Sequence, residues 1–207
     1  MNDKTFFPHI LIIKDGKTMG GPCIRDSNTS SSSSNRVYED RVFEKDPIEE
    51  TAKISDLQNK KKIRIALVSC GKRKKSFPCK AKDMYDSPLF KNSLTLAYNN
   101  TDIVFILSAK HHLLPLEKVI NPYNQTLKDM GKNERIAWAR VVFSQIEEFI
   151  ILNELSWVDI EFVFLAGKAY SEYLKQLFLS KGSKCIDPMQ GLSQGKRLQY
   201  LKNHSII

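Results

Sequence analysis

The sequence lacks any apolar run that approaches the ~20 residues needed for a transmembrane helix. Its short apolar start is interrupted by Pro8 and His9 and has no small-residue cleavage site, so no secretory signal peptide is expected. Only four cysteines are present and none forms a CxxC pair, which argues against a zinc site or a disulfide framework. We therefore expect a reduced, cytoplasmic protein that does not contact a membrane.

Several patterns of catalytic centres are also missing. No DxD, HExxH or paired-carboxylate pattern is evident, so metal catalysis is not required and no cofactor is expected. Gly71 and Lys72 resemble an anion-binding turn, but they lack the full P-loop spacing GxxxxGK[ST]. An NTPase is therefore poorly supported.

What the sequence does have is basic charge, and it is unevenly distributed. The net charge of +9 divides into 8 Lys and Arg against 10 Asp and Glu over residues 1–58, and 24 against 13 over residues 59–207. Such an excess favours a polyanionic partner, although a run of lysines is also typical of a solvated surface. The segment 60–82 contains no acidic residue and ten basic ones: Lys60, Lys61, Lys62, Arg64, Lys72, Arg73, Lys74, Lys75, Lys80 and Lys82.

The first 58 residues are predicted to be a separate extension. Thr29 and the serines up to Ser34 form a low-complexity run that cannot bury apolar surface, which is typical of a flexible linker. No catalytic constellation is found there, so a tail or a docking element is expected. Residues 59–207 are predicted to form one α/β domain of a catalytic type.

The domain alternates between predicted strands and helices. Short β-branched runs predict strands, and stripes of helical spacing predict helices. This alternation is typical of a mostly parallel sheet covered on both faces, here a three-layer sandwich around four strands. The predicted strands span 63–68, 103–107, 160–165 and 184–186, and the predicted helices span 89–98, 132–152, 170–179 and 193–202.

Small and polar residues gather directly after each predicted strand. The segments are SCGK (69–72), SAKHH (108–112), AGK (166–168) and DPMQGLSQGK (187–196). Since ligands of such sheets bind beyond the carboxyl ends of the strands, four such loops indicate a site there. Together with two further polar loops, 83–88 and 121–127, they supply the predicted substrate-binding residues: Ser69, Cys70, Gly71, Lys72, Tyr85, Ser87, Ser108, Tyr123, Gly167, Gln190 and Gly191.

These motifs resemble those of an uncharacterised domain family of bacteria and phages. The family pattern is approximately SCGKxK, DLYxSPLF, LSAKHGLL, PYDxTL, LAGxxY and GLxxGxRLxWL, and it is matched over about residues 62–202. His112 stands where the family usually has Gly, and Asn124 stands where it usually has Asp. If that Asp activates water in the family, Asn124 can position a water molecule but cannot take its proton.

More remotely, the last third is similar to the uracil-DNA glycosylase superfamily. Residues 163–170 correspond to a strand of the type VFLLWGxYA, and residues 187–193 correspond to a loop of the type HPSPLS, with Asp187 in place of its His. The resemblance implies a uracil-DNA-glycosylase-like α/β fold and the removal of an unusual base from phage DNA as antiviral defence.

Three functions follow as hypotheses. The first is a monofunctional DNA glycosylase, in which the target base leaves a double-stranded DNA and enters the pocket. Tyr85 or Tyr123 would stack on the base, water held by Asn121, Asn124 or Asp83 would attack the sugar, and His111 or Lys110 would stabilise the departing base. Basic residues such as Arg73 would hold phosphates. The alternatives are an enzyme that processes free nucleotides or nucleosides, and a non-catalytic nucleic-acid-binding module.

Overall fold

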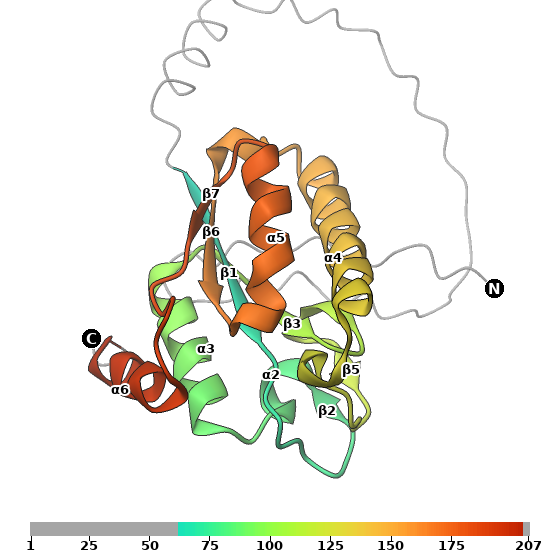
Figure 1. Cartoon of the computed structure of the whole chain (residues 1–207), viewed down its shortest axis with the longest axis vertical. Helices are drawn as coiled ribbons and strands as arrows, with labels where there is room; N and C mark the ends of the chain where they lie inside the picture. Colours follow the sequence, from blue (N-terminus) through green and yellow to red (C-terminus); the bar gives the residue numbers. More distant parts are fainter. Residues whose placement is uncertain (1–61, 205–207) are drawn as a thin grey trace, which may run out of the picture. The chain divides into compact units, whose positions relative to one another are not determined.

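The computed structural model describes residues 62–204, and the predicted extension 1–58 lies outside this range. A five-stranded sheet of order β4-β3-β1-β6-β7 forms the centre of these residues (Figure 1). The strand β1 pairs in parallel with both β3 and β6, β7 is parallel to β6, and β4 is antiparallel to β3. The strands are β1 (Ile63–Ser69), β3 (Ile103–Ser108), β4 (His112–Pro115), β6 (Ile160–Leu165) and β7 (Lys184–Ile186).

Helices cover both faces of the sheet, with α4 and α5 on one side and α3 and α6 on the other (Figure 1). A two-stranded antiparallel pair and two short 3-10 turns, Leu127–Asp129 and Trp157–Asp159, complete the described elements. The pair consists of β2 (Cys79–Lys80) and β5 (Val119–Ile120), and the helices are α2 (Ala81–Met84), α3 (Pro88–Asn100), α4 (Lys132–Leu152), α5 (Lys168–Ser180) and α6 (Gln194–His204).

The alternation of side chains along β1 produces two separate cores. Ile65 and Leu67 point into the cluster formed with α4 and α5, while Ala66 and Val68 point into the cluster formed with α3 and α6. All four side chains are fully buried. A strand buried on both faces is expected to be a continuous apolar run, as it is here.

The strand order places a switch point between β1 and β6. The chain leaves β1 through α3 on one face, and it leaves β6 through α5 on the opposite face. Where the crossovers of two neighbouring parallel strands go to opposite faces, a crevice opens beyond their carboxyl ends. Those ends are level, because Val68 is in register with Leu165 and Ser69 with Leu107.

The structure differs from the sequence prediction at one edge of the sheet. The sequence predicted no strand at residues His112–Pro115, but they form the antiparallel strand β4. The chain reverses directly after β3, and His112 makes this reversal with φ of 60°, a left-handed conformation that favours glycine. This φ explains physically why the family pattern that the chain resembles has Gly at this position. Leu113 and Leu114 are fully buried and hold β4 in the sheet.

Candidate functional site

The switch point is bridged by Cys70 and Tyr170. Cys70 directly follows β1, and its backbone N–H donates to the carbonyl of Leu107, the neighbouring strand end, at 3.0 Å. Its Sγ lies 3.2 Å from the hydroxyl of Tyr170, which is in the first turn of α5. Burial raises the pKa of Tyr170, and the electrostatic influence of Cys70 raises it further. Tyr170 is therefore a neutral phenol at physiological pH.

A chain of three hydroxyl groups lies beside Cys70. The hydroxyl of Tyr123 is 2.9 Å from that of Tyr85 and 2.9 Å from Oγ of Ser108. Burial is the largest cause that raises the pKa of both tyrosines, and Cys70 is the next. The three hydroxyls thus connect the loop after β5, the end of α2 and the end of β3 without any charge of their own.

The direction of these hydrogen bonds follows from the donors around Ser108. Its Oγ accepts the backbone N–H groups of His111 at 2.9 Å and of Lys110 at 3.3 Å, which occupies both lone pairs. The Ser108 hydroxyl therefore donates its hydrogen bond to Tyr123, and the Tyr123 hydroxyl donates its own to Tyr85. The Ser108 carbonyl in turn accepts the indole N–H of Trp138 at 2.9 Å, which fixes the end of β3 on α4.

His111 is placed against this chain of hydroxyls. Its ring meets the ring of Tyr123 edge to face, with centroids 5.2 Å apart and planes at 87°. Burial lowers the pKa of His111, and the charges of Lys110, Lys118 and His112 lower it further. Within residues 62–204, its Nε2 is buried without a hydrogen-bond partner. A neutral imidazole whose Nε2 makes no hydrogen bond within residues 62–204 is therefore held near the end of β3.

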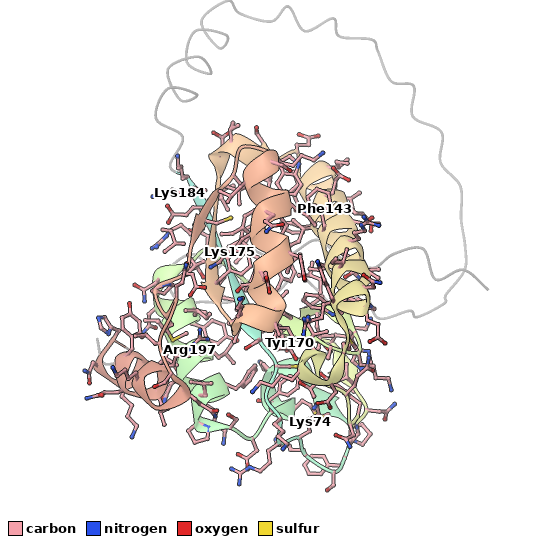
Figure 2. All side chains as sticks on the ribbon, viewed as in Figure 1. Lys74, Phe143, Tyr170, Lys175, Lys184 and Arg197 are labelled. Atoms are coloured by element: carbon pink, nitrogen blue, oxygen red, sulfur yellow. The ribbon has the colours of Figure 1, made fainter. Side chains whose placement is uncertain are left out.

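Lys74 belongs to the same cluster, although it was not among the predicted site residues. It forms an isolated antiparallel bridge with Tyr85, and its Nζ lies 4.2 Å from the centre of the Tyr123 ring and 5.9 Å from that of Tyr85. Burial lowers the pKa of Lys74, while Cys70 acts in the opposite direction. In the sequence, nothing distinguishes Lys74 from the other members of the basic run. Figure 2 shows Lys74 and Tyr170 at the end of the sheet where β1 and β6 finish.

Gly71 is required by the close approach of the loop after β1 to α3. A Cβ atom at this position would lie 3.2 Å from Cβ of Tyr85 and 3.3 Å from Cβ of Ser87. Ser87 precedes the first residue of α3, Pro88, and its side chain makes no capping hydrogen bond. The glycine thus allows the loop to pack directly on the start of α3.

Arg197 holds the loops after β6 and β7 together, a role that the sequence did not indicate. Its guanidinium group donates to the carbonyl oxygens of Ala166 and Leu192, both at 2.9 Å (Figure 2). Ala166 is next to Gly167, the N-cap of α5. The 187–193 loop is fixed at its other end by Lys175, which pairs with the buried carboxylate of Asp187 at 2.6 Å.

The predicted site residues therefore fall into three groups. The structure brings together Cys70, Gly71, Ser87, Tyr85, Ser108, Tyr123 and His111. Ser69 and Gly167 end β1 and begin α5 at the same edge of the sheet. The remaining residues are solvent-exposed: Lys72, Arg73, Asp83, Lys110, Asn121, Asn124, Gln190 and Gly191. Within residues 62–204, the described hydrogen bonds that join any of them to the cluster use only their backbone atoms, the N–H of Lys110 to Ser108 and the carbonyl of Lys72 to Lys74.

Two of these residues have defined surroundings of their own. Asp83 lines a hollow of about 290 Å³ together with Tyr85 and four charged residues, Lys75, Lys82, Asp86 and Lys91. Gln190 accepts a long hydrogen bond from Lys175 at 3.4 Å. The expected stacking of a base on Tyr85 needs a correction, because this side chain is only 1% exposed and its ring packs on Phe90. Tyr85 supports the site from behind and leaves Tyr123 as the aromatic residue nearer the surface.

The comparisons with known proteins assign the chain to a family without assigning a function. The model of DUF6884, a family of unknown function, matches residues 65–203, well over half of the sequence. The chain belongs to the DUF6884 family. This match agrees with the resemblance to an uncharacterised domain family that the motifs between about residues 62 and 202 carry. No curated protein and no solved structure matches the chain.

The DUF6884 region coincides with the five-stranded sheet and its helices. It begins within β1 and ends within α6, so every element of the candidate site lies inside it. None of the described helices of this region is both long enough and apolar enough to cross a membrane.

Proposed function

We propose that this member of the DUF6884 family is a DNA glycosylase that hydrolyses the N-glycosidic bond of a modified base. A hypermodified or glucosylated cytosine of phage DNA, removed as antiviral defence, is the proposed substrate. The observation that carries the proposal is the polar cluster of Tyr123, Ser108 and His111 beside Cys70, at a switch point of a parallel sheet. A base is a flat group with polar edges, which hydroxyl, imidazole and aromatic side chains such as these can contact.

The resemblance to the uracil-DNA glycosylase superfamily supports the same reaction. Its two segments, 163–170 and 187–193, are the end of β6 with the start of α5 and the loop that precedes α6. Arg197 joins these two segments through the carbonyl oxygens of Ala166 and Leu192. A uracil-DNA-glycosylase-like fold is part of the proposal, and Leu192, at the edge of the α3–α6 core, would enter the DNA.

His111 is proposed to stabilise the departing base. Because burial and neighbouring cations lower its pKa, the imidazole is neutral at pH 7 and acts as a hydrogen-bond donor. Its Nε2 has no hydrogen-bond partner among residues 62–204, and this buried atom would make the contact once the base displaces the side chains that cover it. A donor aimed at the leaving base favours charge that develops there as the C1′–N bond breaks.

Water is proposed to be held by the loop that follows β5. Asn121 and Asn124 are both exposed there, on either side of Tyr123, and their amides can position a water molecule without taking its proton. Asp83 has the carboxylate that these asparagines lack, but it lines a hollow among the charged side chains of Lys75, Lys82, Asp86 and Lys91, with Tyr85 in its wall. We therefore assign water positioning to the two asparagines.

The DNA backbone is proposed to contact the exposed basic residues of the loop after β1. Lys72 and Arg73 are exposed there, and the residues from 59 onward carry the whole positive excess of the chain. Cations next to a base pocket hold the phosphates that flank an extruded nucleotide. This arrangement favours DNA over a free nucleotide as substrate.

The proposal is tested by exposing DNA from several phages, with modified and unmodified bases, to the full chain and labelling abasic sites with an aldehyde-reactive probe. Abasic sites are expected only in a modified DNA, with His111→Ala reducing their yield and the exposed, distant His204→Ala leaving it unchanged. Turnover of free nucleotides without abasic sites would favour the small-molecule enzyme. Salt-sensitive DNA binding that survives His111→Ala and yields no product would favour the binding module.

A further inference from the structure

Lys74 is a half-buried lysine whose ammonium group faces aromatic rings instead of a carboxylate. The two basic residues next to it in the sequence have other surroundings. Arg73 pairs with the carboxylate of Asp86, and Lys75 lies over the exposed ring of Phe77. Among residues 62–204, no acidic side chain forms an ion pair with Lys74. Its one described hydrogen bond, to the carbonyl of Lys72, is long at 3.5 Å.

The backbone fixes where this amine lies. The bridge between Lys74 and Tyr85 aligns the loop after β1 with the chain that enters α3. The backbone N–H of Lys75 also donates to the carbonyl of Met84 at 2.9 Å, which extends this alignment. Nζ is thereby held 4.2 Å from the centre of the Tyr123 ring, beside the hydroxyl chain that leads to Ser108.

The surroundings of Nζ affect its protonation in opposite ways. Burial disfavours the ammonium form and is the main cause that lowers the pKa of Lys74. Cys70 and the tyrosine faces favour the ammonium form, but they do not cancel the effect of burial. A larger share of this lysine is therefore neutral amine, which is the nucleophilic form, than of a fully solvated lysine.

We propose that Lys74 is a nucleophile that captures the C1′ aldehyde of an abasic deoxyribose, which gives the protein a DNA lyase activity. The inference rests on the proposed function, because the same cluster of side chains must receive the sugar of a DNA strand. It adds a second chemical step that bond hydrolysis by water alone does not include.

The step is an imine formation followed by an elimination. The lone pair of Nζ attacks C1′ of the open-chain aldehyde, the amine loses two protons, and the aldehyde oxygen leaves with them as water. A water molecule then takes a proton from C2′, the electron pair of that C–H bond forms a C2′=C3′ double bond, and the 3′ phosphate oxygen leaves with the electron pair of its bond to C3′, which cuts the strand. Hydrolysis of the imine by water returns Lys74 to its free form.

Trapping with borohydride tests the proposal directly. The probe is a duplex oligonucleotide with one preformed abasic site, incubated with the full chain in the presence of borohydride, which reduces the imine to a stable amine. The adduct is quantified on a denaturing gel and mapped by mass spectrometry. Lys74→Arg keeps a cation over the tyrosine rings but cannot form the imine. Lys181→Arg is the matched control, since Lys181 also lies over an aromatic ring, Phe143, but follows the far end of α5.

We expect an adduct at Lys74 in the wild-type chain, at least about tenfold less in Lys74→Arg, and no change in Lys181→Arg. A wild-type chain that forms no adduct, or an adduct that maps to another lysine, would overturn the inference without the need for any variant. Because the probe already contains an abasic site, the amount of trapped adduct does not depend on base excision by the protein. Excision from phage DNA without trapping would overturn the lyase step alone, and trapping without excision would overturn the proposed glycosylase alone.

Discussion

The hydroxyl of Tyr123 lies 2.9 Å from that of Ser108, and the two backbone N–H groups that Ser108 accepts make Tyr123 the acceptor of this hydrogen bond. This contact joins the polar loop after β5 to the end of β3, two segments that the sequence separately marks as candidate sites. The Ser108 side chain can act in this way because the backbone N–H groups of Lys110 and His111 already use its lone pairs. The ring of Tyr123 contacts both Lys74 and His111.

Replacement of Tyr123 by phenylalanine tests the structural role of this hydroxyl. The change leaves the buried Ser108 hydroxyl without its acceptor and the Tyr85 hydroxyl without its donor, while it keeps the aromatic ring. We expect Tyr123→Phe to lower the free energy of unfolding by about 1–3 kcal/mol, measured by urea denaturation. Tyr98→Phe is the control, since Tyr98 is 37% exposed and outside the cluster, and it should change stability little. Equal effects of the two substitutions would contradict the hydroxyl chain.

Gly71 provides a test of how tightly the loop after β1 packs on α3. An added methyl group would lie 3.2 Å from Cβ of Tyr85 and 3.3 Å from Cβ of Ser87, and neither atom is at the flexible end of a side chain. We expect Gly71→Ala to destabilise the fold by about 1–3 kcal/mol in thermal or chemical denaturation.

Gly195 is the matched position for this experiment. It lies within α6, and a Cβ atom there would meet nothing within 4 Å. Because alanine is favoured over glycine in a helix by about 1 kcal/mol, Gly195→Ala should be neutral or stabilising. A Gly71→Ala variant as stable as Gly195→Ala would show that the loop does not pack as described.

The pH dependence of stability should depend on Glu161. This carboxylate, at the end of the sheet opposite the site, binds Lys184 at 2.8 Å and Arg64 at 2.9 Å across three neighbouring strands. The hydrogen bond from Lys184 is the main cause that lowers the pKa of Glu161, and Arg64 contributes, whereas burial opposes it. Its stabilising effect is therefore complete above the ordinary pKa of 4.5 and is lost as the pH falls through the lower value of the folded state.

Glu161→Gln removes this contribution. Since Lys184 and Arg64 are both partly exposed, we expect a loss of only about 1–2 kcal/mol at neutral pH, which disappears in acid. Denaturation curves at several pH values measure the difference, with the exposed Glu148→Gln as control. A difference between wild type and Glu161→Gln that does not shrink in acid would contradict this assignment.

Asn124 offers a gain-of-function prediction. The family pattern has Asp at this position, and a carboxylate can take a proton from water where an amide cannot. We expect Asn124→Asp to raise the rate of base release by at least about tenfold, with the apparent pKa of a carboxylate in its pH profile. Asn121→Asp, on the other side of Tyr123, serves as the comparison. A rate that falls in Asn124→Asp would contradict water positioning by this residue.

Much of the sheet could be predicted because its strands are buried on both faces. The predicted strands 63–68, 103–107, 160–165 and 184–186 match the structure within one residue at each end, and the predicted helix 132–152 matches α4. The strand β4 was missed, since it is four residues long and begins at a histidine in a left-handed conformation. Its stability comes from Leu113 and Leu114 packing in tertiary structure, which no local pattern reveals.

The candidate site was predictable as a location, but its contacts were not. The rule that polar residues follow parallel strands located Cys70, Ser108 and Gly167 at one edge of the sheet. It gave no reason to choose Lys74 among ten basic residues, because that choice depends on a bridge to Tyr85. Nor did it indicate that Arg197, in the first turn of α6 after the 187–193 loop, returns to the carbonyl of Ala166.

The central claim is that the cluster around Tyr123 and His111 removes a base from DNA, and release of the free base tests it most directly. Modified phage DNA is incubated with the wild-type chain, and the small molecules in the filtrate are identified by mass spectrometry. The account predicts a free modified base in amounts equal to the abasic sites formed, and its loss in His111→Ala. Release of nucleotides, or of nothing from any modified DNA, would contradict it.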